Sequence, residues 1–451
     1  MSAYAEYKEI NLPWLKAIPI HWEVRRNKNI FTEQKEIVGE KLSDYTLLSL
    51  TLNGIVPRDM EGGGKFPESF DKYKVVRSGD MAFCLFDIDE TPRTVGLSGH
   101  DGMLTGAYTI MHISNINSRF IYYYYLSLDN GKMLKPLYSG LRKTININTF
   151  QSTKVPVPPR DEQNQIVRFL DWKVSSINKL INIKKKEIKN IDALKRSMIS
   201  HAITHGLSSD APMKYSGVKW LGDIPAHWQI VKLRQMLHPV SEKNHPELPL
   251  LSVVREQGVI LRDIEDTESN HNYIPDDLSG YKVVKKGQFA MNKMKAWQGS
   301  YGISEYTGIV SPAYFIFDVD FEDLEYFHFA IRSKVYVNFF AQASDGIRVG
   351  QWDLQIDKMK EIPFIAPPVE EQKTIVEYIK RTLPKYDVAI GKLSEEVNVL
   401  EEYKTKLIAD TVTGKIDVRN VKIPKFEFVD ENIDSVDEEA IGSESDPPEE
   451  E

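Results

Sequence analysis

The sequence predicts an α+β protein made of two copies of one module, each followed by a long helix. Three observations predict this fold class. A long helical pattern occurs twice, at residues 161–206 and 370–414. Framework segments recur in the same order before each helix, and short β-rich runs separated by Gly and Asp turns lie between them.

Both helical segments follow a Pro-Pro sequence, at Pro158-Pro159 and Pro367-Pro368, and both carry one narrow apolar stripe. The stripe consists of Leu170, Val174, Ile177, Ile181, Ile188, Ile191, Met198 and Ala202 in the first copy, and of Leu383, Tyr386, Ile390, Leu393, Val397, Leu400 and Leu407 in the second. A stripe of this length at three-four spacing is typical of a coiled-coil seam.

The charges of the two segments favour their pairing with each other. Residues 161–206 carry nine Lys or Arg against five Asp or Glu, whereas residues 370–413 carry seven against nine. We therefore predict an antiparallel coiled coil, roughly 65 Å long at ~1.5 Å per residue, in a pseudo-twofold molecule whose chain ends lie near each other. Two long helices that pack separately on their own modules are the alternative. Pro384 should bend or break the second helix.

The repeat extends to the modules themselves, with offsets of 203 to 209 residues. The matching segments are 14–22 and 220–228, 48–49 and 251–252, 54–59 and 258–263, 73–76 and 281–284, and 140–142 and 346–348. Strands are expected at 74–76, 81–86 and 108–113, and helices at 118–128 and 321–332. Residues 84–93 do not resemble residues 292–301. One scaffold thus presents two different surfaces.

Composition limits the class of protein. With 451 residues and a single cysteine, Cys84, the chain has material for several domains and no cysteine pair for a disulfide. It has no export leader and no long apolar run, so we expect a cytoplasmic protein. The last 26 residues hold 12 acidic and no basic residues, which leaves +4 on the preceding 425. We expect a disordered, solvated tail from Phe426, with competition against an anionic ligand as the alternative.

The sequence contains no complete catalytic motif. Gly62-Gly63-Gly64 reads as a turn, the nuclease-like Pro275-Asp276 lacks a following Asp/Glu-x-Lys, and no methyltransferase or nucleotide-binding motif is present. His21 and His227 lie beside tryptophans and are read as core residues. Glu162-Gln163 and Glu371-Gln372 fall in the first helical turns, where capping explains them.

These motifs together resemble the specificity subunits of Type I restriction-modification enzymes. The resemblance rests on Trp-Leu-Gly-Asp-Ile-Pro-Ala-His-Trp at 220–228 with its N-terminal counterpart, on the helix entries at 158 and 367, and on Thr-Gly-Lys-Ile-Asp-Val-Arg at 413–419. It implies a target-recognition domain at 1–160, a conserved helix at 161–206, a linker with a second target-recognition domain at 207–369, a second conserved helix at 370–414, and a junction with the tail at 415–451.

The resemblance also implies a function. Each recognition domain would bind one half of a bipartite, asymmetric site in double-stranded DNA, while two methylation subunits dock on the helices and junctions and restriction subunits cut. The chain itself would carry no catalytic residue, metal or cofactor; S-adenosylmethionine, ATP and Mg²⁺ would bind the partner subunits. Two domains held apart by a rod can reach major grooves about 34 Å apart, which leaves a spacer of roughly six base pairs unread.

Polar residues of the unmatched loops are the candidates for DNA contact. They are Arg93, Arg142, Lys143 and Thr144 in the first domain, and Lys293, Lys295, Gln298, Arg348 and Gln351 in the second. Arg142 and Arg348 occupy equivalent places, which suits phosphate contacts common to both domains. A non-catalytic scaffold that binds proteins through its two modules is the alternative function, because +4 is modest for a nucleic-acid binder. An enzyme fused to this scaffold is a second alternative, and the absence of methyltransferase, nuclease and nucleotide-binding motifs argues against it.

Overall fold

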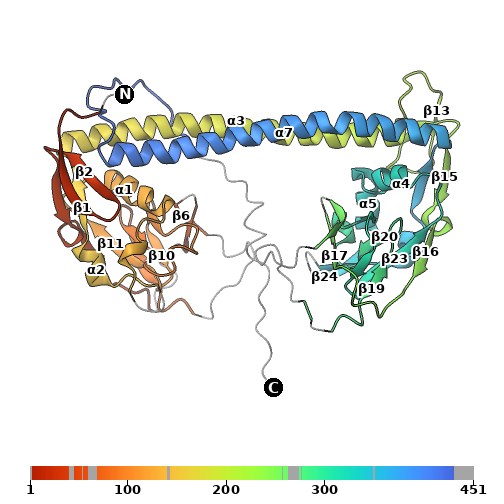
Figure 1. Cartoon of the computed structure of the whole chain (residues 1–451), viewed down its shortest axis with the longest axis horizontal. Helices are drawn as coiled ribbons and strands as arrows, with labels where there is room; N and C mark the ends of the chain where they lie inside the picture. The colour runs from red at the N-terminus through yellow and green to blue at the C-terminus, as the bar shows by residue number, and fades with distance from the viewer. Residues whose placement is uncertain are drawn as a thin grey trace. The chain divides into compact units, whose positions relative to one another are not determined.

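The computed structural model describes residues 3–39, 45–52, 54–58, 69–139, 143–255, 257–262, 274–275, 277–348 and 351–430. The chain forms two compact units (Figure 1). The first comprises residues 1–186 and 393–451, and the second comprises residues 187–392. The two long helices, α3 (Arg160–His205) and α7 (Val369–Val412), each contribute one half to either unit.

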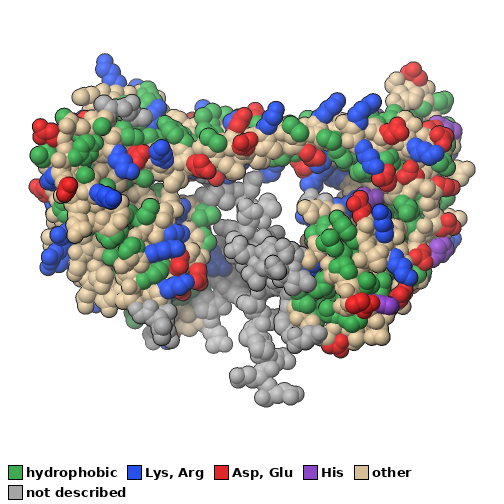
Figure 2. Space-filling view, in the orientation of Figure 1, with side chains coloured by type: hydrophobic (Ala, Val, Ile, Leu, Met, Phe, Trp, Pro, Cys, Tyr) green, Lys and Arg blue, Asp and Glu red, His purple; other side chains and the backbone are tan. Residues whose placement is uncertain are grey.

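The two helices pair antiparallel within each unit (Figure 1). In the first unit, Lys404 donates to Asn178 (3.3 Å) and Lys184 pairs with Glu396, so residue numbers on α7 fall as those on α3 rise. In the second unit, Lys195 Nζ lies 2.6 Å from the Asp387 carboxylate. Figure 2 shows basic and acidic side chains interspersed along the helices. The predicted antiparallel pairing and its charge complementarity are confirmed, and the alternative of separately packed helices is wrong.

Pro384 lies inside α7, which continues through it without interruption. Of the predicted bend or break at Pro384, the break is therefore wrong. Proline removes one backbone hydrogen bond and costs ~3 kcal/mol in a helix interior. Ile379 and Leu383, just before it, pack into the hydrophobic core of the second unit, and this burial outweighs the loss.

The first module is a set of small antiparallel sheets around one helix, α1 (Ser118–Asn130). Its central sheet has the order β4-β11-β8-β9, and the pairs β1-β2, β3-β12, β5-β6 and β7-β10 surround it. The strands are β1 Tyr7–Leu12, β2 Leu15–Pro19, β3 Glu23–Arg26, β4 Phe31–Gln34, β5 Leu48–Thr51, β6 Gly54–Pro57, β7 Lys74–Val76, β8 Met81–Phe83, β9 Val95–Leu97, β10 Gly102–Leu104, β11 Thr109–Ile113 and β12 Lys154–Val157. A short helix, α2 (Ile147–Ser152), precedes β12.

The second module repeats this topology. Its central sheet, β16-β23-β20-β21, matches the first in order, and the pairs β13-β14, β15-β26, β17-β18 and β19-β22 match the others. One further hairpin, β24-β25, is added. The strands are β13 Met213–Tyr215, β14 Asp223–Pro225, β15 Gln229–Lys232, β16 Leu237–Val240, β17 Leu251–Val254, β18 Gly258–Leu261, β19 Lys282–Val284, β20 Phe289–Asn292, β21 Tyr301–Ile303, β22 Gly308–Val310, β23 Tyr314–Val319, β24 Ser344–Arg348, β25 Gln351–Leu354 and β26 Pro363–Ala366. The helices are α4 Leu324–Ile331, α5 Lys334–Gln342 and α6 Ile356–Lys360. The predicted α+β repeat is confirmed.

A polar cluster joins each module to the start of a long helix; its glutamate is buried in the first unit and exposed to 42% in the second. In the first unit, Glu162 accepts hydrogen bonds from Trp22 Nε1 (2.9 Å) and Tyr4 Oη, and it pairs with His21 Nε2 (2.7 Å). In the second unit, the Glu371 carboxylate accepts from Trp228 Nε1 (2.8 Å) and pairs with His227. The predicted place of both glutamates in the first helical turn is confirmed, but their hydrogen-bond partners are side chains of the module rather than the backbone N–H groups expected of a cap. His21 and His227, read as core residues, are partly exposed and bind these carboxylates.

The following glutamines also bind outside their own helical turn. Gln163 donates to Pro158 O and accepts from the Asn117 backbone N–H, and Gln372 donates to Pro367 O. These hydrogen bonds connect the Pro-Pro segment before each long helix to the first turn of that helix.

The two helices end in the same way. Gly206 and Gly414 both follow the last helical turn with φ of +74° and +76°, a left-handed conformation that glycine adopts without strain. Gly206 packs on Trp228 and Gly414 on Trp22. In the first unit, Tyr7 Oη donates to Gly414 O (3.0 Å), and the Arg419 guanidinium lies 4.9 Å from the centre of the Tyr4 ring. The segment at the start of the first module thus meets the junction after α7, as predicted for the two half-junctions.

The segment after α7 is an extended strap, residues 415–430, that runs along α3. Gln165 Nε2 donates to Val418 O (3.0 Å) and Val421 O (2.8 Å), and further along α3 Asn178 Nδ2 donates to Val429 O (3.0 Å). Val418 is fully buried. The prediction that disorder begins at Phe426 is wrong for residues 426–430, because amide side chains of α3 hold their backbone; residues 431–451 lie outside the described residues.

His328 on α4 makes the stability of the second unit depend on pH. Its Nδ1 accepts a hydrogen bond from the Ile303 backbone N–H (3.2 Å), and burial, followed by the nearby Arg332, lowers the pKa of His328 to about 4. The unfolded chain has a His pKa of about 6.5. As the pH falls from 6.5 towards 4, the unfolded state binds the proton first, so stability is lost in that window.

We expect the free energy of unfolding to fall by about 2 kcal/mol between pH 7 and pH 5 through this group alone. His328→Gln should remove that share of the pH dependence in urea denaturation. His238→Gln, on an exposed residue of β16, is the matched control. Equal pH dependence of wild type and H328Q would contradict the expectation.

Candidate nucleic-acid interface

The structure brings two distant segments of the first module together into one surface, here called the first loop pair: residues 84–93 on one side and residues 139, 143 and 144 on the other. Thr144 forms a β-bridge with Phe86, and the Ile145 backbone N–H donates to Leu85 O (2.7 Å). Lys143 donates to Glu90 (2.8 Å) and Asp89 (3.4 Å), and these hydrogen bonds raise the pKa of Lys143. Lys143 and Thr144, predicted to contact DNA, therefore lie against the unmatched loop.

Two residues of the first loop pair have left-handed backbone conformations. Asp87 has φ of +43° and Lys143 has φ of +48°. A non-glycine residue pays strain for such a conformation, and strain of this kind is concentrated at functional sites. Asp87 lies in the segment 84–93, which does not resemble the second module, and Lys143 lies in the segment that meets it.

The other predicted residues of this domain have different outcomes. Arg93 donates to Asp129 (3.0 Å) and Asn130 (2.8 Å) at the end of α1, and its side chain is only 16% exposed. Its guanidinium thus ties the loop to α1 and offers little surface for DNA. Arg142 lies outside the described residues.

A second loop pair occupies the equivalent place in the second module: residues 292–298 on one side and residues 344–348 and 351–354 on the other. Lys293 Nζ lies 2.6 Å from the Asp353 carboxylate, and the Leu354 N–H donates to Lys293 O (3.2 Å). Lys295 is exposed, and the partly buried Gln298 ends a short 3-10 helix, η5 (Ala296–Gln298). Arg348 and Gln351 pair across the β24-β25 hairpin. Five predicted residues therefore come from two segments that meet.

Sequence reasoning missed the aromatic and acidic members of these surfaces. Trp297 and Trp352 contact each other in the second loop pair, with ring centres 5.0 Å apart. Asp89 and Asp353 hold the candidate lysines. The signal was present, because both tryptophans fall in unmatched segments, but only polar residues of those segments were considered for base contact.

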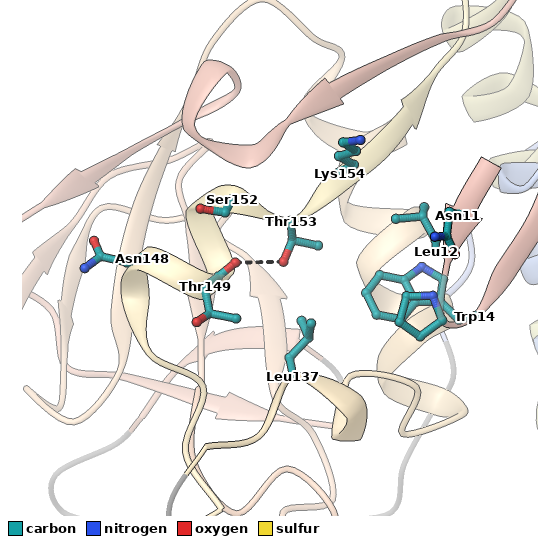
Figure 3. Close-up of a pocket in the computed structure, with 10 residues that line it drawn as sticks. Asn11, Leu12, Trp14, Leu137, Asn148, Thr149, Ser152, Thr153 and Lys154 are labelled. Atoms are coloured by element: carbon teal, nitrogen blue, oxygen red, sulfur yellow. Dashed lines mark hydrogen bonds between the residues drawn. The ribbon is translucent and has the colours of Figure 1, made fainter.

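A pocket lies elsewhere in the first module (Figure 3). It is bounded by the β1-β2 turn with Leu12 and Trp14, by Leu137, and by α2 with Thr149. Lys154 is the one ionisable side chain among the residues that line it. None of the predicted DNA-binding residues lies there, so the pocket is not part of the interface.

Within the described ranges, no group of three or more His, Cys, Asp or Glu side chains is placed to hold a metal ion. No helix in that part of the chain is long and apolar enough to cross a membrane. The sole cysteine, Cys84, is buried, and its burial raises the pKa of its thiol.

Comparisons with known proteins agree with this architecture. Residues 102–190 match the family model described as the Type I restriction modification DNA specificity domain. The chain is 25% identical to the Type I restriction enzyme MjaVIII specificity subunit of Methanocaldococcus jannaschii, over 92% of this chain and 98% of that one. It is also 25% identical to the putative type I restriction enzyme MjaX specificity subunit of the same organism, again over 92% and 98%.

A solved structure from work on complex assembly and conformational transition of a type I R-M system has the same fold. It superposes with a TM-score of 0.57 at 12% identity and covers 88% of this chain and 99% of that chain. Fold and site define a two-module protein with paired helices and, on each module, a loop-pair surface of different composition. Over 92% of its length, the chain is similar to specificity subunits of Type I restriction-modification enzymes.

Proposed function

We propose that this chain selects the DNA sequence on which a Type I restriction-modification complex acts. Each loop pair binds one half of a bipartite, asymmetric site in double-stranded DNA. One observation carries the proposal: the two modules share a fold and place their loop pairs at equivalent positions, yet the side chains differ. A common scaffold with different contact residues suits two unlike half-sites.

In this proposal, this chain selects the DNA sequence, and other chains carry out catalysis. Two methylation subunits dock on the long helices and junctions and methylate adenine with S-adenosylmethionine. Restriction subunits supply the ATP- and Mg²⁺-dependent cutting. This chain holds none of these cofactors. The spacing between the half-sites is set by the paired helices.

Methylome sequencing of the host, with and without this chain, tests the proposal. We expect one bipartite adenine-methylation motif that disappears when the chain is deleted. An unchanged methylome in a host whose partner methyltransferase is expressed would contradict DNA selection and favour the rival function, a scaffold that binds proteins through its two modules.

Lys295 gives a direct test of the second loop pair. This lysine is exposed, and we expect Lys295→Ala to weaken binding to the specific site about tenfold, within the range of a lost base contact. Lys286→Ala is the matched control, because Lys286 is an exposed lysine of the same module in the turn before β20, at the opposite end of that strand. Binding is measured by titration of labelled duplex at fixed salt. Equal losses in both variants would indicate a non-specific charge effect.

A further inference from the structure

The second loop pair contains an apolar surface that its charged residues do not explain. Trp297 from the loop and Trp352 from the hairpin are both partly buried, and their rings meet at 47° with centres 5.0 Å apart. Beside them, Met294 is 49% exposed. Keeping large apolar side chains at a solvent-facing loop costs free energy, and such a surface favours a binding role.

The polar edge of one tryptophan is already used. Trp297 Nε1 donates to Met294 O (3.1 Å), which folds the loop back on itself. The indole N–H of Trp297 is therefore not directed at a ligand, and its remaining surface is apolar. The adjacent Lys293 pairs with Asp353, next to Trp352, so this ion pair clamps the loop to the hairpin and holds the two rings together.

The first loop pair has a different character. It contains Phe86 and no tryptophan, and it presents Asp89, Glu90 and Lys143. Tyr138, just before the second segment of this loop pair, donates its hydroxyl to Asp89 (3.0 Å), so Tyr138 also makes a polar contact. The two modules thus offer a polar and an apolar surface at equivalent places.

In the major groove, the base edges carry donors, acceptors and one apolar group, the 5-methyl of thymine. We propose that Trp297, Trp352 and Met294 read a thymine 5-methyl group in the half-site bound by the second module. This inference rests on the proposed function, because it assumes that the second loop pair faces DNA. The exposed Lys295 next to Met294 supplies the positive charge that brings a phosphate backbone to this apolar surface.

Deoxyuridine tests the inference with the wild-type protein, because it pairs like thymine and lacks only the methyl group. Once the recognition site is known, the full chain with its methylation subunits is titrated with duplexes in which each thymine of the site is replaced singly. We expect about three- to tenfold weaker binding at one or two positions of one half-site, the size of effect that burial of one methyl group produces.

Trp352→Ala then identifies the contact. In this variant the penalty for deoxyuridine at those positions should fall below twofold, whereas penalties in the other half-site stay unchanged. Trp220→Ala is the matched control, because Trp220 is 60% exposed in the same unit and lies outside the loop pair. It should leave every penalty as in wild type.

Each outcome has one meaning. Sequence-specific binding without any deoxyuridine penalty overturns the methyl contact and leaves the proposed function intact. A penalty that persists in W352A assigns the methyl contact to other residues and overturns it as well. Equal binding of specific and scrambled duplexes overturns the proposed function and the inference together. The wild-type titration decides the first case even if W352A does not fold.

Discussion

Glu162→Ala should cost about 3 kcal/mol in free energy of unfolding, the range for removing one partner from a buried hydrogen-bonded charge cluster. The side chain is 5% exposed and accepts from Trp22 and Tyr4 while pairing with His21. After truncation, the buried indole N–H and the phenol O–H lose their acceptor, and water does not reach them. Urea denaturation measures the loss.

Glu371→Ala is the matched experiment within the same chain. Glu371 holds Trp228 and His227 in the same way, but its side chain is 42% exposed. Water replaces the missing carboxylate, and we expect a cost of about 1 kcal/mol. Hydrogen exchange adds a local readout, because E162A should speed exchange in β1 and β2. Equal costs at the two glutamates would contradict the role assigned to burial.

Truncation after Gly414 should destabilise the first unit by about 4 kcal/mol, because the strap closes its core. Val418 is fully buried, and Ile416, Val421 and Ile423 pack against the same core. A fully buried aliphatic side chain contributes ~1.5–3 kcal/mol and a partly buried one less. The amides of Gln165 and Asn178 also lose the carbonyls that they bind.

The control for this truncation is a chain that ends at Asp430. It keeps every contact of the described strap, residues 415–430, and removes residues 431–451, so its free energy of unfolding in urea should match wild type within about 0.5 kcal/mol. A chain ending at Gly414 that is as stable as wild type would show that the strap contributes nothing to the fold.

Predictions from local sequence were wrong where a side chain binds a partner that is far away in the chain. Glu162 looks like a cap because its neighbours in sequence are a helix start, yet its partner Trp22 is 140 residues away. Arg93, Lys143 and Lys293 look like free cations, yet Asp129, Asp89 and Asp353 hold them. Composition also misled at the strap, because acidic residues predict disorder while the amides of α3 hold the backbone of residues 426–430.

The amino-acid order alone determined the repeated modules, the two long helices, their opposite charge and the resemblance to a known family. A duplication leaves the same residues at the same spacing, and an apolar stripe at helical period requires a partner. Only the tertiary structure decided which side chains form the loop pairs, that tryptophans stand among them, and that the end of the chain packs on α3. The reason is physical: helix pairing follows from periodicity along the chain, whereas a binding surface is made of side chains from separate segments, whose proximity no local pattern records.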